Sequence, residues 1–358
     1  MLPAVDASAR PAPVRVIVVD DSAIARGMII KFLERDPDVA VVGRAPNGEA
    51  AIAEVKRTDA DIVVLDIEMP VMDGLTALPF ILKARPGVKV IIASSVARRS
   101  AKISLEALQI GASDYVPKPD GGRLGAAEDF ADELLRKVKA LGAARAPRQD
   151  RPAPVALRSA PAAATAPLAA VVIGGSTGAP PALMAIAKEL RGALEQPILV
   201  AQHMPPTFTT MLAEQLERAY GAPAAEGQDG EPVLPGRIYL APGGWHMTVA
   251  REGEAPVIRL NQEPPEHYCR PSVNPLLRSA AQVYGAGVLA AILTGMGGDG
   301  AEGCRAVAGA GGRFIVQDKE TSVVWGMPGA AAKTGLASAV LPLSEIAAFI
   351  RRAAEKNS

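Results

Sequence analysis

The feature that most constrains the fold is a series of short apolar runs between residues 15 and 141, separated by helix-like segments. The runs are V-R-V-I-V-V-D, V-A-V-V-G, D-I-V-V-L-D, V-K-V-I-I-A-S and S-D-Y-V-P-K. Strands buried on both faces of a parallel sheet show such continuous valine and isoleucine runs, and the intervening segments are long enough for crossover helices. We therefore predict a flavodoxin-like, (βα)5 doubly wound domain over residues 15–141.

A second series of apolar runs follows between residues 169 and 353. The runs lie at 170–173, 197–201, 237–240, 257–260, 288–293, 313–316 and 338–341. They predict a second α/β domain, doubly wound and mostly parallel, over residues 169–353. Residues 142–168 are rich in alanine and proline without sustained periodicity, which predicts a linker, and residues 1–14 are expected to form a flexible tail.

Composition narrows the class of protein. The 358 residues are 49% hydrophobic, enough for two domains with buried cores. Lys plus Arg and Asp plus Glu number 38 each, so no overall charge favours nucleic acid as a partner. Residues 160–174 form the most apolar long stretch, which is broken by proline and too short to insert directly into a membrane.

The two cysteines and the N-terminus indicate the compartment. Cys269 and Cys304 are far apart and have no metal-ligand neighbours, so we expect two free thiols in a reducing environment. The first residues lack the basic start and apolar core of a signal peptide. A cytoplasmic protein is expected.

Acidic residues end two of the first domain's predicted strands. Asp20 and Asp21 follow the first run, Asp66 ends the third, and Lys118 lies in V-P-K-P after the fifth. The carboxyl ends of parallel strands meet at one edge of a sheet. Three carboxylates there could hold a hard divalent cation such as Mg²⁺. The alternative is that strand-end acids only cap neighbouring helices.

These residues together predict a phosphoryl-accepting site. Asp66 is the expected nucleophile and would form an aspartyl phosphate, while Lys118 would pair with the phosphoryl oxygens. Ser94, at the end of the fourth run, could donate its hydroxyl to the new group. The Tyr115 side chain could move inward in response to phosphorylation of Asp66.

A serine follows the first strand of the second domain, in the sequence G-G-S-T-G over 174–178. A glycine-flanked turn after a strand exposes the Ser176 hydroxyl and directs backbone N–H groups toward a developing oxyanion, which makes Gly175, Thr177 and Gly178 groove candidates. The same turn could cradle a phosphate. However, the Walker Lys-Ser/Thr pair and the spacing of the dinucleotide fingerprint are missing.

A serine nucleophile needs a general base, and the chain contains three histidines. His203 ends the run P-I-L-V-A-Q-H, so it should emerge on the same sheet edge as Ser176. His246 begins a predicted strand near that edge, and His267 lies in a proline-rich loop. We rank them in that order.

The base must in turn be held by an acid. Asp299, in I-L-T-G-M-G-G-D-G, follows an apolar strand and is better placed than Asp229 or Asp318. The order Ser, His, Asp differs from that of α/β-hydrolases, so the similarity to G-x-S-x-G is interpreted as convergent.

The motifs V-V-D-D-S, L-D-I-E-M-P-V-M-D-G and G-A-S-D-Y-V-P-K-P resemble those of response-regulator receiver domains over residues 15 to about 135. The resemblance implies phosphorylation of Asp66 by a partner histidine kinase. It also implies Mg²⁺ held by Asp20 or Asp21, by Asp66 and by the backbone carbonyl of Glu68.

The second domain resembles the catalytic domain of chemotaxis protein-glutamate methylesterases through G-G-S-T-G, Q-H-M-P-P-T-F-T, R-P-S-V, I-L-T-G-M-G-G-D-G and V-V-W-G-M-P. The resemblance implies hydrolysis of glutamate γ-methyl esters on chemoreceptors, deamidation of receptor glutamines, and recruitment to receptor clusters. The family's triad falls on Ser176, His203 and Asp299, with Met296 beside them and no cofactor for the esterase reaction.

Four positions depart from the family's usual pattern. G-G-S-T-G-A replaces G-A-S-T-G-G, Cys269 stands where histidine is frequent, and Asn274 stands where aspartate is usual. Three other functions stay open: a non-catalytic binding module controlled by phosphorylation, the same esterase in a non-motility chemosensory pathway, and a receiver-regulated nucleotide-binding protein.

Overall fold

A computed structural model describes residues 12–95, 97–119, 125–143 and 166–355. The chain divides into two compact units, Met1–Val96 with Ile110–Ala146, and Ala97–Gln109 with Pro147–Ser358. The predicted tail lies outside the described residues up to residue 11, and the predicted linker does so from 144 to 165.

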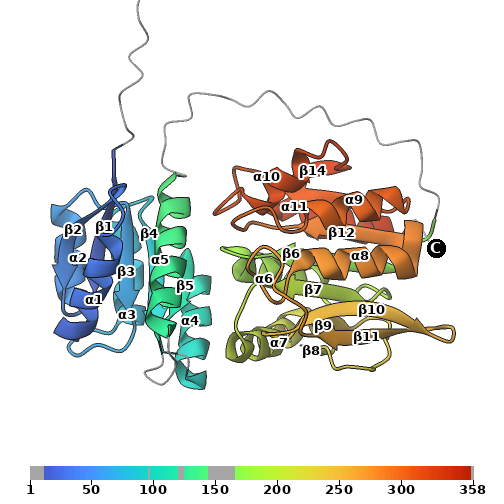
Figure 1. The fold of residues 1–358 in the computed structure, drawn as a ribbon, viewed down its shortest axis with the longest axis horizontal. Helices are drawn as coiled ribbons and strands as arrows, with labels where there is room; N and C mark the ends of the chain where they lie inside the picture. The colour runs from blue at the N-terminus through green and yellow to red at the C-terminus, as the bar shows by residue number, and fades with distance from the viewer. Residues whose placement is uncertain (1–11, 96, 120–124, 144–165, 356–358) are drawn as a thin grey trace, which may run out of the picture. The chain divides into compact units, whose positions relative to one another are not determined.

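The first unit is built on a five-stranded parallel sheet with the order β2-β1-β3-β4-β5 (Figure 1). Its strands are β1 (Val14–Val19), β2 (Val39–Ala45), β3 (Ile62–Asp66), β4 (Lys89–Ser94) and β5 (Asp114–Pro117). Each of the five predicted runs forms one strand. The order is that of flavodoxin-like folds, so the carboxyl ends of β1 and β3 meet at the point where the strand order reverses.

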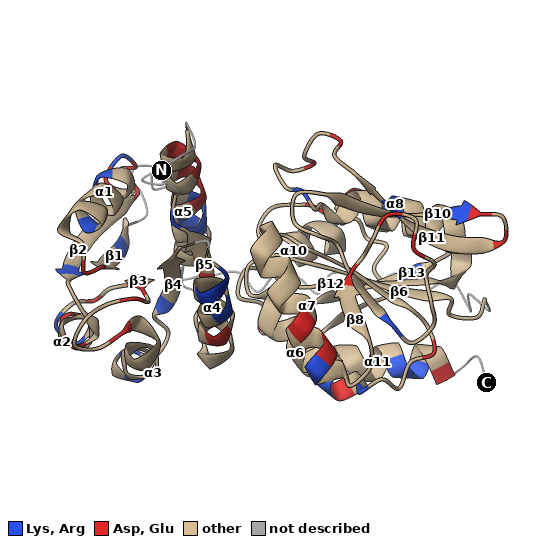
Figure 2. Cartoon of the chain, turned by 90° about the horizontal axis from the view of Figure 1, so that it is seen from below, with Lys and Arg blue, Asp and Glu red and all other residues tan. Residues whose placement is uncertain are grey.

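Helices connect these strands. They are α1 (Ala23–Leu33), α2 (Gly48–Arg57), α3 (Gly74–Ala84), α4 (Arg98–Ile110) and α5 (Ala126–Ala143). Helix α1 packs against α5, and α2 against α3. Helix α4 connects β4 to β5 along the chain, although most of it groups with the second unit. Figure 2 shows both signs of charge on α5, where acidic residues occupy the first half of the helix and basic residues follow in the second.

The second unit contains a seven-stranded parallel sheet and a separate antiparallel hairpin, β10-β11. The order of the large sheet is β14-β13-β12-β6-β7-β9-β8. The strands are β6 (Ala170–Gly175), β7 (Ile198–Gln202), β8 (Ala224–Glu226), β9 (Ile238–Leu240), β10 (His246–Glu252), β11 (Ala255–Asn261), β12 (Val288–Ile292), β13 (Arg313–Gln317) and β14 (Ala339–Leu341).

Helices cover both faces of this sheet (Figure 1). Helices α6, α7 and α11 pack together, and α8 packs against α9, which contacts α10. The helices are α6 (Ala179–Leu190), α7 (Pro206–Tyr220), α8 (Val273–Tyr284), the short 3₁₀ helix η1 (Gly285–Gly287), α9 (Ala301–Gly309), α10 (Met327–Ala332) and α11 (Leu343–Glu355).

The predicted α/β fold of both domains is confirmed, with two differences in the second. The run at 257–260 belongs to β11 of the hairpin and not to the large sheet. Strand β8 was not predicted, because its three residues, A-A-E, contain no apolar run. Among the described helices, none combines the length and apolarity needed to cross a bilayer.

Candidate functional sites

The first site is a cluster of three carboxylates at the carboxyl ends of β1 and β3. One ligand atom each from Asp20, Asp21 and Asp66 lies within 4.8 Å of the others. Asp20 and Asp66 are buried, whereas Asp21 is exposed. Oxygen donors this close together suit a hard cation such as Mg²⁺, because they neutralise its charge and keep an open side for water or phosphate.

Lys118 bridges the two buried carboxylates. Its Nζ lies 2.8 Å from Asp20 Oδ2 and 2.9 Å from Asp66 Oδ1. Burial raises the pKa of Asp66, although the Lys118 ammonium acts in the opposite direction. The lysine follows β5, and its backbone N–H donates to Ser94 O at 2.7 Å. The structure thus brings these predicted residues to one sheet edge.

Two further predicted residues of the first unit occupy different environments. Ser94 ends β4 and is buried. Tyr115 is 4% exposed, and Lys137 Nζ lies 5.0 Å from its ring centroid. The ring is thus already buried in this structure, and the predicted movement of Tyr115 on phosphorylation stays a prediction. The exposed Glu68 side chain is not in the carboxylate cluster, and its predicted role involves its backbone carbonyl.

The second site begins at the turn between β6 and α6, where Ser176 lies. The Ser176 N–H donates to Thr294 O at 3.1 Å, and Ser176 O accepts from Gln202 Nε2 at 3.0 Å. Gly178 caps α6 with a φ of 78°, a value that favours glycine. The half-buried serine therefore lies on a strand-turn-helix connection, the geometry that presents a nucleophile.

Sequence reasoning missed three residues that hold this turn, namely Gln202, Thr294 and Gly295. Thr294 Oγ1 also donates to Thr177 O at 2.9 Å. A Cβ on Gly295 would lie 2.9 Å from Ser176 Cβ, so only glycine allows this close approach. The sequence contained a signal that could have found them, because all three residues belong to motifs already singled out. Gln202 begins Q-H-M, and Thr294 and Gly295 lie in I-L-T-G-M-G-G-D-G.

His203 and Asp299 form a direct pair beside the serine turn. His203 Nε2 lies 2.7 Å from Asp299 Oδ2, and the two side chains are 10% and 1% exposed. In the parallel register Gly175 of β6 faces Gln202 of β7, so the residues that follow them, Ser176 and His203, emerge at the same edge. The His203 N–H also donates to Gly175 O at 3.2 Å.

The N-terminus of α8 holds the Asp299 carboxylate. Oδ2 accepts from the Val273 N–H at 2.6 Å, and Oδ1 accepts from Asn274 and Gly300 at 3.1 and 2.8 Å. Helix N-termini offer unpaired N–H groups and a favourable dipole to an anion. Burial alone would raise the pKa of Asp299, but His203 and these donors outweigh it and lower the pKa.

Asp299 in turn changes the pKa of its partner, His203. Burial tends to lower the pKa of His203, but the hydrogen bond and charge of Asp299, with a contribution from the neighbouring Cys269 thiol, raise it above the usual value. Cys269 and Cys304 are both free thiols, as predicted.

The other two histidines have different surroundings. His246 is buried, its Nδ1 accepts from the Ser272 N–H at 3.2 Å, and its Nε2 lies 3.2 Å from Pro264 O. Both ring nitrogens are therefore occupied by backbone groups. His267 is exposed on a loop. The geometry supports the ranking of His203 first.

The predicted groove residues surround Ser176 at different depths. Thr177 is 2% exposed, Gly175 is buried, and Gly178 and Met296 are half-buried. Met296 follows Gly295, which approaches the serine closely. These positions are compatible with a groove, and their roles stay predictions.

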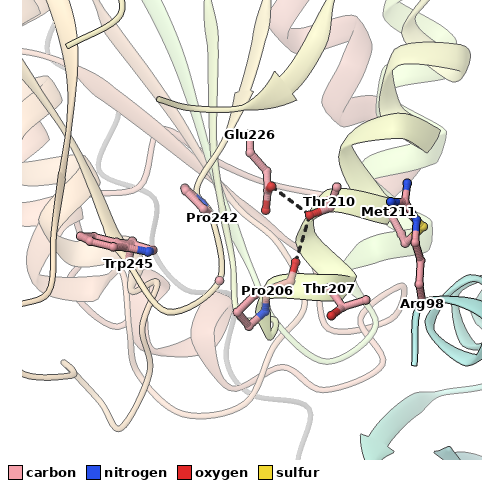
Figure 3. A pocket seen from close by; sticks show the side chains of 9 residues that line it. Arg98, Pro206, Thr207, Thr210, Met211, Glu226, Pro242 and Trp245 are labelled. Carbon is pink, nitrogen blue, oxygen red and sulfur yellow. Dashed lines mark hydrogen bonds between the residues drawn. The ribbon is translucent and has the colours of Figure 1, made fainter. Parts of the chain in front are cut away.

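A pocket lies beside the start of α7, a few residues after His203. Pro206, Thr210, Glu226 and Trp245 are among the residues that line it. Figure 3 shows the Thr210 hydroxyl between Pro206 O and the Glu226 carboxylate, at 3.2 and 2.9 Å. The carboxylate is thereby held in one orientation.

The unusual G-G-S-T-G-A sequence has a packing explanation. A Cβ on Gly175 would lie 2.4 Å from the Cβ of Ala179. The space thus holds one methyl group, which this chain supplies from position 179 and the commoner G-A-S-T-G-G pattern supplies from position 175.

We expect Gly175→Ala to lower the free energy of unfolding by about 1–3 kcal/mol, because overpacking forces the backbone to shift. Combining it with Ala179→Gly should restore most of the loss. Thermal unfolding of the three variants forms a double-mutant cycle. Additive losses in the double variant would contradict the shared-space explanation.

Comparisons with known proteins agree with both halves. A family model described as CheB methylesterase matches residues 171–350, and one described as response regulator receiver domain matches residues 16–127.

Full-length relatives extend the similarity over most of the chain. An Azospirillum brasilense protein named protein-glutamate methylesterase/protein-glutamine glutaminase is 49% identical, and the match covers 96% of this chain and 93% of that protein. A Rhodospirillum rubrum protein with the same name, numbered 1, is 48% identical with 96% of each covered. The crystal structure of the Thermotoga maritima CheB methylesterase catalytic domain is 39% identical, covers 52% of this chain and 99% of that chain, and has a TM-score of 0.51.

Proposed function

Because this chain belongs to the CheB methylesterase family and carries a response regulator receiver domain, we propose that it hydrolyses glutamate γ-methyl esters on chemoreceptors under control of phosphorylation. Deamidation of receptor glutamines belongs to the same proposal, because its relatives carry both activities in their names. The observation that carries the chemistry is the His203–Asp299 pair beside the Ser176 turn.

The residues have the following proposed roles. His203 donates its Nε2–H to Asp299, so Nδ1 is the nitrogen left to take the Ser176 proton. The serine oxygen attacks the γ-carbonyl, and the backbone at Gly175, Thr177 and Gly178 or at Met296 stabilises the oxyanion. Methanol, or ammonia from glutamine, leaves with the proton returned by His203. Water then attacks the glutamyl-enzyme and releases glutamate without any cofactor.

The receiver site is proposed to control this reaction. Asp66 would take a phosphoryl group from a chemotaxis histidine kinase, and Lys118 and Ser94 would contact the new oxygens. Asp20, Asp21, Asp66 and the Glu68 carbonyl would hold Mg²⁺, which would offset the phosphoryl charge. Tyr115 would respond to the change.

The proposed domain limits are 15–141 for the receiver and 169–353 for the esterase, joined by a linker over 142–168. The end of α5 at Ala143 and the start of β6 at Ala170 support them. The proposed place of action is the cytoplasmic face of receptor clusters, since the substrate side chains belong to receptors.

The test of the proposed function is release of methanol from methylated chemoreceptor membranes, with and without a small-molecule phosphodonor and Mg²⁺. Release that rises with the phosphodonor supports both halves. Absence of release would favour a phosphorylation-controlled binding module, and specific ATP binding at the 174–178 turn would favour a nucleotide-binding protein.

Replacing Asp66 by asparagine should leave basal methanol release unchanged and remove its stimulation by the phosphodonor. Phosphorylation switches typically couple sites by roughly 5–150-fold, so the loss is measurable. Asp61→Asn is the matched control, because Asp61 precedes β3 at the opposite end of that strand. Stimulation that persists in Asp66→Asn would show that another group accepts the phosphoryl.

A further inference from the structure

We infer that Tyr268 contacts the receptor polypeptide next to the reacting glutamyl ester and helps to select the substrate. This inference rests on the proposed function. Tyr268 is 95% exposed, although a large aromatic side chain left in water loses the favourable burial of its ring.

The backbone that presents Tyr268 is unusual. The Cys269 N–H donates to Glu266 O at 2.9 Å, which closes a two-residue turn. Its central residues, His267 and Tyr268, have φ values of 51° and 63°. Two consecutive positive φ values define a type I′ turn, in which Asn-Gly is strongly preferred and bulky side chains are rare.

Ionic and polar contacts hold the turn in place. Both terminal guanidinium nitrogens of Arg278 in α8, Nη1 and Nη2, contact the Glu266 carboxylate, with Nη1 donating to Oε2 at 3.0 Å. Arg270 Nη1 donates to Gln262 O and Glu263 O at 2.8 and 3.0 Å. The turn is therefore anchored on both sides, and the unfavourable backbone persists because its surroundings impose it.

The anchored turn adjoins the catalytic pair. The thiol of Cys269, the next residue after Tyr268, is near enough to His203 to raise the pKa of its ring. Four residues later the Val273 N–H donates to Asp299. Hence the exposed ring belongs to the segment 268–273, which approaches both members of the pair.

A second aromatic residue lies on an adjoining loop. The Gly244 N–H donates to Arg270 O at 3.1 Å, which ties the loop of Trp245 to the chain that follows the turn. Trp245 is 39% exposed. Exposed aromatic side chains on rigid supports are the residues that most often anchor a protein partner. A protein-bound ester reaches Ser176 only if its flanking polypeptide rests on the rim of the site, where Tyr268 stands.

The test separates binding from chemistry. Tyr268→Ala should raise KM for methylated receptor membranes roughly tenfold with kcat nearly unchanged, the pattern of lost uniform binding. Hydrolysis of p-nitrophenyl acetate should stay at the wild-type rate, and Tyr268→Phe should restore KM. Leu234→Ala is the matched control, because Leu234 is 50% exposed and precedes β9 at the opposite sheet edge.

A second variant distinguishes recognition from turn geometry. His267→Asn combined with Tyr268→Gly supplies the residues that a type I′ turn prefers, so the melting temperature should stay level or rise. KM should nevertheless rise as in Tyr268→Ala. A wild-type KM in either variant, with methanol release still dependent on Ser176, would overturn the inference and leave the proposed function standing. Wild-type protein that releases no methanol would overturn both.

Discussion

Replacing Ser176 by alanine will abolish methanol release from methylated receptors, with a loss of at least about 10³-fold in kcat. The variant keeps the backbone bonds to Thr294 and Gln202 that shape the turn, because neither uses the serine hydroxyl. What disappears is the oxygen that attacks the carbonyl. Methanol measured under saturating phosphodonor gives the largest dynamic range.

The matched control for this variant is Ser338→Ala. Ser338 precedes β14 at the opposite edge of the same sheet. It should retain wild-type turnover, and both variants should unfold at the wild-type temperature. Retained hydrolysis by a folded Ser176→Ala protein would remove the serine from the mechanism and direct attention to another nucleophile.

Replacing Asp299 by asparagine should lower kcat/KM by about 10⁴-fold, because the amide no longer fixes the His203 tautomer or stabilises the imidazolium. The substitution also places an NH₂ group among backbone donors at the start of α8, so the free energy of unfolding should fall by about 1–3 kcal/mol. The measurement is kcat/KM of folded protein, checked by thermal unfolding.

Asp318→Asn is the control for charge and side-chain shape, since Asp318 follows the neighbouring strand β13 and its carboxylate accepts from the N–H and hydroxyl of Thr321 within its own turn. It should retain full activity. If Asp299→Asn were as active as this control, the acid of the triad would have to be sought elsewhere.

The pH profile provides an independent check on the same pair. Only neutral His203 can take the serine proton, and Asp299 raises the pKa of His203. The activity should therefore rise with pH through a pKa above the usual histidine value of about 6.5. In the Asp299→Asn variant, the pH at which the residual activity rises should be lower, because the carboxylate that raises the pKa of His203 is gone. A wild-type limb below the usual value would contradict the raised pKa.

Much of the fold and site could be predicted from local patterns. Continuous apolar runs marked β1, β3 and β4 in the middle of the first sheet, because a strand buried on both faces must be apolar along most of its length. The strand-end rule then grouped Asp20, Asp66 and Lys118, and separately Ser176 with His203, and each group lies at one sheet edge in the structure.

Other features of the fold and the site could not be predicted from those patterns. Strand β8 is too short to show a periodicity, and β11 has the same apolar character as a strand of the large sheet although it pairs only with β10. Gln202 holds the serine turn through its side-chain amide, and Thr294 through its hydroxyl and its backbone carbonyl. All three bonds end on backbone groups of the turn, so the motifs that contain or adjoin these residues did not show which partners they hold.

The sequence by itself determined which residue types stand at the ends of buried parallel strands, and hence the two sites and their chemistry. Only the tertiary structure decided that Asp299 is held by the first N–H groups of α8, and that positions 175 and 179 share room for one methyl group. The tertiary structure also decided that a type I′ turn exposes Tyr268 in the segment beside His203. Each depends on how closely separate segments approach, a distance set by packing of the whole domain and not by local propensity.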